Sequence, residues 1–279
     1  MAHPTPSNGR GASRRAWMAG MLAAGVFPRA AGAEQPARFT LRSSHVGRDF
    51  DIAVTPPLPP AAAPLPCVYL LDAGYHVAPQ TAVAMQAAGQ IAPAYTVAIG
   101  YPPGAPNLRE RDLLHRPHPD SSGALIGGGG AAFEAFIVDE LRPLIESRHA
   151  VDPACAILLG HSLAGLFTTN VLADRPQAFR AFLMASPSLW ADPTTLARVR
   201  AAAPRGDGRL AFVTVGGAET PRMRAGVDAL RGALGGPRST FALGGETFPG
   251  QTHMSYYPAF LAAALPAALP PSRPGPPSG

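Results

Sequence analysis

A serine placed where an apolar segment turns into a helix is the feature of this 279-residue chain that points most directly to chemistry. Ser162 stands in the segment Gly-His-Ser-Leu-Ala-Gly at residues 160–165, directly after the apolar residues 157–159. A strand that turns sharply through small residues into a helix exposes such a serine above the sheet, the nucleophile elbow usually written Gly-x-Ser-x-Gly. The alternative is a serine that caps an ordinary helix. We interpret Ser162 as a nucleophile, with Ala164 as a one-methyl departure from the pattern.

A base and an acid follow this serine in an order that suits it. A serine hydroxyl is a weak nucleophile at neutral pH, so it needs a base and a carboxylate that orients the base. His253 is the last histidine of the chain, and Glu219 follows the apolar residues 210–215. The order serine, acid, histidine is typical of hydrolases with this elbow. We therefore predict His253 as the base and Glu219 as the acid, with Asp228 and Glu246 as alternative acids.

Two backbone N–H groups are expected to stabilise the oxyanion that develops during acyl transfer. One is that of Leu163, at the head of the helix after the serine. The other should come from the loop after the apolar residues 68–71, with Gly74 as the first choice and Tyr75 as the alternative. These are backbone roles, so the sequence supports them mainly through position.

The elements that must position these residues alternate along the chain. Continuous apolar runs separated by helical patterns are typical of an α/β fold with a mostly parallel central sheet and helices on both faces. Ligands bind such sheets at the carboxyl ends of the strands, where all three predicted residues fall. Strands are expected at residues 39–44, 49–55, 68–71, 95–99, 156–159, 181–184, 210–215 and 239–242. Helices are expected at residues 81–89, 131–148, 163–173, 194–202, 222–234 and 255–264.

Composition and charge exclude several classes of function. All 23 basic residues are arginine, which excludes Schiff-base chemistry and any lysine base. Of the net charge of +5, four positive charges lie in residues 1–33, leaving 19 basic against 18 acidic residues beyond them. The body is therefore nearly neutral, and nucleic acid is not an expected partner.

Both ends of the chain differ from its body. Residues 1–33 contain Ser-Arg-Arg-Ala-Trp-Met, a short apolar stretch and an Ala-Gly-Ala site, which together resemble a twin-arginine signal peptide. The alternative for this segment is a disordered extension. We expect a periplasmic or secreted protein with no stable membrane span after signal removal, because the apolar stretch is too short. Residues 34–265 form the predicted catalytic domain, and the proline-rich residues 266–279 a disordered tail.

One loop, residues 101–130, is long for a compact domain, and such loops are usually functional or disordered. It contains Arg109 and Asp112 and ends in four consecutive glycines at residues 127–130. We interpret the glycine run as a mobile flank of this loop.

Four segments resemble the putative-esterase family of α/β-hydrolases, which contains the enterobactin-type siderophore esterases and the esterase D-like enzymes. They are residues 69–74, residues 136–143, the elbow, and the Ala-Ser-Pro-Ser-Leu-Trp segment at residues 185–190. Residues 109–113 resemble the family's Arg-x-x-Asp-Tyr-Thr-Pro motif but lack its tyrosine, threonine and proline. The resemblance covers residues 37 to about 265 and implies an α/β-hydrolase fold.

The resemblance also implies a catalytic triad and a substrate cleft. It carries the nucleophile to Ser162, the base to His253 and the acid to Glu219. Ser186 and Trp190 would line the substrate cleft, and Tyr75 is a further expected substrate contact. Arg109 would face an anionic or catechol-bearing substrate, or brace its loop through Asp112.

These observations predict an exported serine esterase that acts on a small-molecule ester without a metal or organic cofactor. Siderophore trilactones are the first expected substrates, because the resemblance lies there. Carbohydrate-linked acetyl or feruloyl esters come second, and acyl transfer with exclusion of water comes third. A carrier of the same fold without turnover is the alternative from another class of function.

Overall fold

The computed structural model describes residues 37–58, 60–61, 64–72 and 77–271. The predicted signal peptide, the oxyanion candidates Gly74 and Tyr75 and residues 272–279 therefore lie outside the described residues. Among the helices described, none has the length and apolar character that a membrane span requires.

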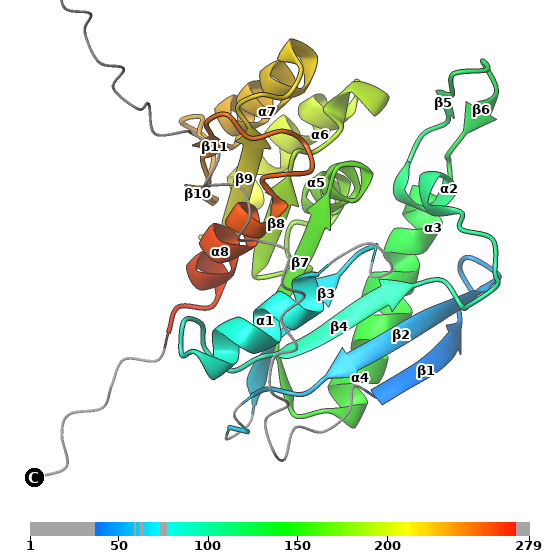
Figure 1. The fold of residues 1–279 in the computed structure, drawn as a ribbon. Coiled ribbons are helices and arrows are strands. Elements are labelled where there is room, and N and C mark those ends of the chain that lie inside the picture. Colours follow the sequence, from blue (N-terminus) through cyan, green and yellow to red (C-terminus); the bar gives the residue numbers. More distant parts are fainter. Residues whose placement is uncertain (1–36, 59, 62–63, 73–76, 272–279) are drawn as a thin grey trace, which may run out of the picture. The chain divides into compact units, whose positions relative to one another are not determined.

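A mixed sheet forms the centre of the domain (Figure 1). Among the described residues it contains nine strands, in the order β1-β2-β4-β3-β7-β8-β9-β10, with β11 also paired to β9. β1 and β2, and β2 and β4, pair antiparallel, whereas the remaining pairs are parallel. The strands are β1 (Ala37–Arg42), β2 (Asp49–Thr55), β3 (Leu65–Leu70), β4 (Tyr95–Gly100), β7 (Val151–His161), β8 (Ala181–Ala185), β9 (Leu210–Gly216), β10 (Ala242–Gly244) and β11 (Thr247–Phe248). The predicted α/β class with a mostly parallel sheet is confirmed.

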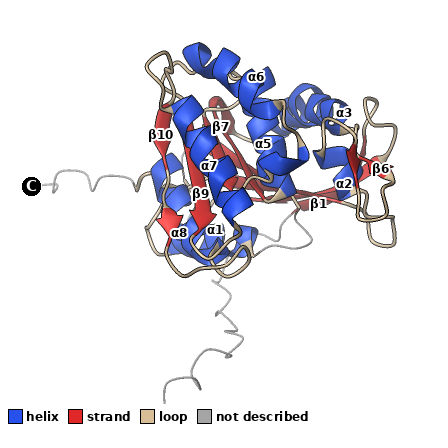
Figure 2. Ribbon diagram, turned by 90° about the horizontal axis from the view of Figure 1, so that it is seen from above, coloured by secondary structure: helices blue, strands red, loops and turns tan. Residues whose placement is uncertain are grey.

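Helices cover both faces of this sheet, as Figure 2 shows. Alternate side chains of a strand face opposite sides, so Tyr69 and Leu158 belong to one core cluster, and Val68 and Leu159 to the other. The first cluster packs under α3 (Gly130–Ala135), a π-helical turn (Phe136–Leu141), α4 (Arg142–Arg148), α5 (Leu163–Asp174), α6 (Thr195–Ala202) and α7 (Pro221–Leu234). The second packs under α1 (Ala78–Ala87) and α8 (Tyr257–Ala268). Both faces are buried, which explains the continuous apolar runs of the central strands.

Two predicted boundaries near the C-terminus are wrong. The strand expected at residues 239–242 begins only at Ala242, because Thr240 donates its backbone N–H to the Ala203 carbonyl instead of joining the sheet (2.9 Å). The tail expected from residue 266 is ordered at its start. Helix α8 continues through Pro266, and Leu269 is buried and accepts a hydrogen bond from Ala92 N–H (3.2 Å). Burial of the apolar helix face outweighs the hydrogen bond that proline removes.

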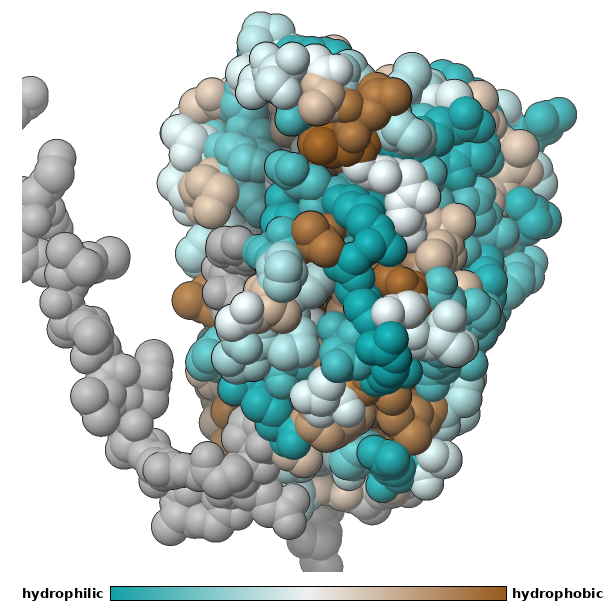
Figure 3. All heavy atoms as spheres, turned by 90° about the vertical axis from the view of Figure 1, so that its right-hand side faces the viewer, coloured by the Kyte–Doolittle hydropathy of each residue, from teal (hydrophilic) through white to brown (hydrophobic). Residues whose placement is uncertain are grey.

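The long loop between β4 and α3 is folded against the domain. It contains α2 (Arg109–Leu113) and a two-stranded hairpin, β5 (His118–Pro119) with β6 (Leu125–Ile126). The glycine run after the hairpin, predicted to be a mobile flank, packs closely against the preceding part of the loop. A Cβ on Gly130 would lie 2.5 Å from the His115 ring, and one on Gly127 would lie 2.7 Å from the Leu114 Cβ. Figure 3 views the side of the domain that carries this hairpin, where hydrophobic side chains form separate small groups on a mainly hydrophilic surface.

Candidate active site

Ser162 occupies a strained turn between β7 and α5. Its φ of 60° and ψ of −117° lie in a region that residues with a side chain rarely adopt. Hydrogen bonds hold this backbone from both sides. Its N–H donates to the Ala185 carbonyl (2.9 Å), and its carbonyl accepts from the N–H groups of Leu166 (2.9 Å) and Ser188 (3.1 Å). The strand–turn–helix context expected of a nucleophile elbow is present.

Glycines on either side of the turn permit a close approach of strand and helix. A Cβ on Gly160 would lie 2.2 Å from the Ala164 carbonyl oxygen, and one on Gly165 would lie 2.8 Å from the Ala185 carbonyl oxygen. The methyl group of Ala164 itself is accommodated in the core, where the residue is fully buried. The crowded positions are therefore 160 and 165, which explains why alanine is tolerated at the last position of the pattern.

Glu219 and His253 form a hydrogen-bonded pair at the carboxyl end of the sheet. The Nδ1 atom of His253 lies 2.7 Å from Glu219 Oε2. Glu219 Oε1 accepts from the Gly216 N–H (2.8 Å) and from the Ser186 hydroxyl. Burial by itself would raise the pKa of Glu219, but the hydrogen bonds from His253, Ser186 and Gly216 outweigh it and hold the pKa below its usual value. The carboxylate is therefore ionised, and both of its oxygens accept hydrogen bonds.

The two alternative acids lie elsewhere. Asp228, on α7, has a side chain that is 70% exposed and pairs with Arg231 (3.6 Å). Glu246 is exposed, and its backbone carbonyl accepts from the Val215 N–H (3.4 Å). Of the three carboxylates considered, the structure brings Glu219 to the histidine.

His161 connects the histidine to the elbow. It is buried beside Ser162, its Nε2 lies 3.0 Å from the His253 carbonyl oxygen, and the two rings are 4.5 Å apart between centroids. The segment that carries His253 is thus held against the residue that precedes the serine. In this structure the Ser162 hydroxyl itself contacts the Ser188 hydroxyl, with 3.3 Å between the oxygens.

Ser186 does not line a cleft, so this sequence prediction is wrong. The residue is completely buried at the end of β8, and its hydroxyl faces Glu219 and the Tyr256 hydroxyl (2.7 Å). Its φ of 40° turns the side chain inward, a feature that strand periodicity cannot reveal. Sequence reasoning also gave no role to Ser188, whose place in the Ser-Pro-Ser segment was the available signal.

Trp190 keeps an exposed ring near the hairpin. It is 38% exposed, and its ring meets the His118 ring edge-on with 5.2 Å between centroids. The Arg222 guanidinium carbon lies 5.4 Å from the Trp190 ring centroid. These contacts leave an aromatic surface open to solvent, as a substrate contact would need.

Arg109 braces a different carboxylate from the one expected. Its guanidinium binds Asp72 through two nitrogens, with the shortest contact at 2.7 Å, and Asp72 has a φ of 57°. Asp112 is bound instead by the Tyr101 hydroxyl (2.9 Å) and Arg48 (3.5 Å), and burial raises the pKa of this carboxyl. Bracing through Asp112 is therefore wrong, because α2 directs Arg109 toward the end of β3.

Leu163 is the first residue of α5. The N–H groups of a first helical turn have no partner within the helix, so this one is suited to an oxyanion.

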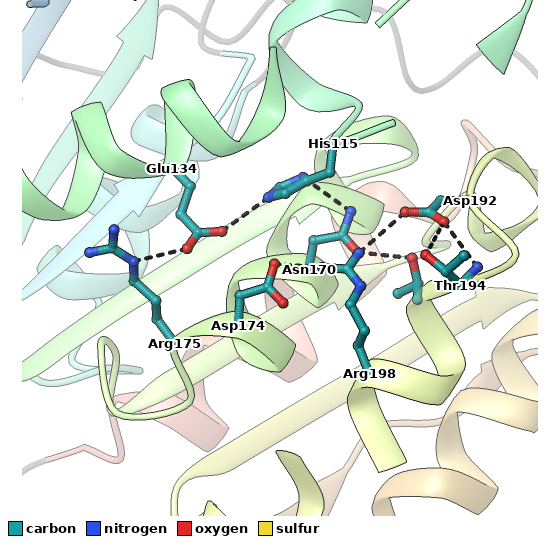
Figure 4. Close-up of polar contacts among 9 residues, drawn as sticks. His115, Glu134, Asn170, Asp174, Arg175, Asp192, Thr194 and Arg198 are labelled. Atoms are coloured by element: carbon teal, nitrogen blue, oxygen red, sulfur yellow. Dashed lines mark hydrogen bonds and ion pairs between the residues drawn. The ribbon is translucent and has the colours of Figure 1, made fainter. Parts of the chain in front are cut away.

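A network of ion pairs and hydrogen bonds ties the long loop to α3, α5 and α6 (Figure 4). His115 Nε2 lies 3.0 Å from Glu134 Oε2, and Arg198 binds Asp174 and Asp192. The remaining members shown in Figure 4 include Asn170, Arg175 and Thr194. His115, Glu134 and Asp174 offer ligand atoms within 4.8 Å of one another, which is compatible with a metal ion. Because Glu134 and Asp174 already pair with arginines, we interpret the cluster as an ion-pair network.

Comparisons with known proteins agree on one family. The model of a family described as putative esterase matches residues 43–258. Ferri-bacillibactin esterase BesA of Bacillus subtilis (strain 168) is 33% identical over 172 residues, which are 56% of this chain and 60% of the relative. The match thus spans less than two thirds of that relative's length.

Solved structures share the fold over most of the chain. The BES protein from Bacillus cereus has a TM-score of 0.76 at 24% identity, covering 85% of this chain and 96% of that one. The enterobactin hydrolase IroE in complex with DFP has a TM-score of 0.65 at 21% identity, covering 83% of this chain and 94% of that one. The expected α/β-hydrolase fold is confirmed.

Proposed function

This chain belongs to the putative-esterase family, and from that membership we propose that it is a serine esterase that hydrolyses carboxylic esters. The observation that carries the proposal is the convergence of a strained serine and a hydrogen-bonded Glu219–His253 pair at one sheet edge. A buried histidine between them holds the two segments together.

The pair of Glu219 and His253 provides the general base. Because Glu219 is ionised, its Oε2 accepts a hydrogen bond from the Nδ1–H of His253, which leaves Nε2 as the basic nitrogen. When an ester binds, the hydroxyl of Ser162 directs its proton to the imidazole while its oxygen stays beside Ser188. Catalytic hydrogen bonds are often incomplete in structures without substrate.

Hydrolysis then follows in two half-reactions. Ser162 Oγ attacks the ester carbonyl carbon while its proton passes to His253 Nε2, and the oxyanion is stabilised by the Leu163 N–H. We propose Gly74 as the second donor, with Tyr75 as the alternative. The protonated imidazole gives its proton to the leaving alcohol, and water repeats the sequence to release the acid.

Siderophore esters are the proposed substrates, because the relative reported above is named a ferri-bacillibactin esterase and another relative is named a siderophore triacetylfusarinine C esterase. Trp190 offers an aromatic contact for such a ligand. Arg109 is engaged by Asp72, so we assign it a bracing role rather than direct contact with an anionic ligand.

We further propose export through residues 1–33. Changing the arginine pair at residues 14–15 to lysines should retain the precursor inside the cell, as fractionation would show.

Purified protein and the Ser162→Ala variant test the reaction. The wild type should release p-nitrophenol from a short p-nitrophenyl ester with a burst, and Ser162→Ala should lower kcat by about 10³-fold or more. A matched control is Ser147→Ala, on the exposed side of α4, which should behave as the wild type. A carrier protein would bind ligand without turnover and would refute the proposal.

A second comparison assigns the substrate class. A triscatecholate trilactone, a feruloyl sugar and an acetyl sugar are offered at equal concentration, with product followed by chromatography. We expect the trilactone to give the highest kcat/KM. A higher kcat/KM for either sugar ester would indicate that the protein hydrolyses carbohydrate esters. Product that forms only when an alcohol acceptor is added would indicate acyl transfer.

A further inference from the structure

The segment Ser186-Pro187-Ser188 after β8 contacts both the nucleophile and the acid. We propose that its two serines are positioning residues: Ser188 aims the hydroxyl of Ser162, and Ser186 fixes the carboxylate of Glu219. The inference rests on the proposed function, because it concerns how that reaction is prepared.

Ser188 is held against the nucleophile by two contacts. Its N–H donates to the Ser162 carbonyl (3.1 Å), and its hydroxyl oxygen lies 3.3 Å from Ser162 Oγ. Ser188 is 1% exposed, so water cannot readily replace a partner for this hydroxyl. A buried hydroxyl without a partner is costly, and the nucleophile is the partner that the structure provides. The orientation of the Ser162 side chain is therefore coupled to Ser188.

Ser186 is held against the acid in a similar way. It is completely buried, its hydroxyl donates to Glu219 Oε1, and its N–H donates to the Thr214 carbonyl (2.9 Å). The Tyr256 hydroxyl lies 2.7 Å from Ser186 Oγ, and burial raises the pKa of this tyrosine, which keeps its proton. Tyr256 can therefore donate to Ser186 while Ser186 donates to Glu219. A buried chain of hydrogen bonds thus leads through Glu219 to His253.

The backbone makes a rigid spacer of the segment. Ala185, immediately before it, accepts the Ser162 N–H, so the segment starts at the elbow itself. Pro187 fixes one backbone angle, and its Cα would lie 3.1 Å from a Cβ on Gly165, which shows how closely it packs on α5. Ser186 has a φ of 40°, a strained value that its surrounding contacts must maintain. The backbone of this segment therefore holds the Ser186 hydroxyl toward Glu219 and the Ser188 hydroxyl toward Ser162.

Each serine should have its own chemical effect. As the Ser162 proton passes to His253 and Oγ attacks the ester carbonyl carbon, the Ser188 hydroxyl keeps its own proton and donates a hydrogen bond to Oγ, which carries partial negative charge until its bond to carbon has formed. Ser186 keeps Glu219 Oε2 directed at His253 by occupying Oε1. Losing Ser188 should therefore slow attack by the nucleophile, whereas losing Ser186 should matter only while the carboxylate is present.

The test uses a fluorophosphonate, which reacts with an activated serine, together with steady-state turnover of a p-nitrophenyl ester. We expect Ser188→Ala to slow labelling and kcat by about 10- to 100-fold with little change in KM, because one donor to a developing charge is lost. Ser186→Ala should cost about 5- to 30-fold in the wild type and less than about twofold in a Glu219→Gln background. Ser188→Ala should keep its full effect in that background. Ser147→Ala is again the control.

Cysteine variants separate hydrogen bonding from packing. A thiol is larger than the hydroxyl group and fills its place, but it is a weak donor, so the activity of Ser188→Cys should resemble that of Ser188→Ala. If the cysteine variant is as active as the wild type, the effect is packing and the inference is wrong. If Ser186→Ala does not fold, Tyr256→Phe can be used instead, because it removes the hydroxyl that donates to Ser186. This substitution should lower kcat in the wild-type background but not in the Glu219→Gln background.

Failure of the inference and failure of the proposed function look different. A wild-type protein that neither reacts with the fluorophosphonate nor hydrolyses esters refutes the function. A reactive wild type with Ser186→Ala and Ser188→Ala within about twofold of it refutes only the positioning roles. An equal loss from Ser186→Ala in both backgrounds would show that Ser186 does not act through Glu219.

Discussion

Replacing Glu219 by glutamine removes one negative charge from the candidate site while keeping the side-chain shape. The carboxylate acts as an acceptor in each of the contacts described above: from His253 at 2.7 Å, from the Gly216 N–H at 2.8 Å and from the Ser186 hydroxyl. A glutamine amide offers one acceptor and two donors. If its NH₂ group faces His253, the imidazole must take the wrong tautomer; if it faces the Gly216 N–H, two donors meet.

The lost attraction sets the size of the effect. Two unit charges about 4 Å apart interact by about 4 kcal/mol at an effective dielectric constant of about 20. This is the order of the stabilisation that Glu219 gives an imidazolium at His253 during proton transfer. Since about 1.4 kcal/mol changes a rate tenfold, the upper value is about 10³-fold. The His253 side chain is 33% exposed, and solvent screening lowers this value, so we expect kcat to fall by about 10²- to 10³-fold.

The same substitution should change how stability depends on pH. The pKa of Glu219 is held below its usual value in the folded protein. The group therefore contributes stability above the pKa of the unfolded chain, about 4.3, and loses it as pH falls through the lower folded value. The difference in Tm between wild type and Glu219→Gln should be largest near pH 6 and should shrink toward pH 3.

Stopped-flow release of p-nitrophenol measures the rate, and differential scanning calorimetry measures Tm. Asp228→Asn is the matched control, because that carboxylate is 70% exposed on α7, and it should keep wild-type turnover within about twofold. Wild-type turnover in Glu219→Gln together with a collapse in Asp228→Asn would refute the assignment of the acid. A Tm difference that is constant with pH would refute the argument from the carboxylate's hydrogen bonds.

Three further substitutions test the fold around the site. Gly160→Ala should lower stability by about 2 kcal/mol or more, seen as a lower Tm, because its Cβ would lie 2.2 Å from a backbone carbonyl oxygen; an unchanged Tm would contradict this close approach. Ser162→Gly should be about 1 kcal/mol more stable to urea than Ser162→Ala, because a φ of 60° favours glycine, and equal midpoints would argue against strain at the elbow. Arg198→Ala should cost about 2–3 kcal/mol in urea unfolding, because the Asp192 side chain, 1% exposed, loses its guanidinium partner. A cost below about 0.5 kcal/mol would show that the network of Figure 4 contributes little to stability.

Local sequence patterns were enough to predict the main helices and strands and two of the site residues, Ser162 and His253. The apolar runs at residues 156–159 and 210–215 predicted central strands, and they lie within β7 and β9. Ser162 was found because an elbow is a local feature of strand, small residues and helix. Position in the chain placed His253 after the last strand, and the structure brings it to Glu219.

Local pattern failed where a side chain is directed by contacts distant in the sequence. Ser186 was predicted to face substrate, yet it faces Glu219, 33 residues away. Arg109 was predicted either to face substrate or to brace its loop through Asp112, yet it binds Asp72, 37 residues away. The sequence also did not reveal that the glycine run at residues 127–130 permits close packing against residues 111–117.

The amino-acid sequence by itself determined the α/β class, the strained serine and the order of the three candidate residues, because periodicity and turn chemistry act over a few neighbouring positions. The tertiary structure alone decided which carboxylate meets the histidine, since Glu219, Asp228 and Glu246 all lie within reach along the chain. It also decided that Ser186 and Ser188 face the acid and the nucleophile. Such choices depend on where loops from separate strands converge, and no local sequence pattern contains that information.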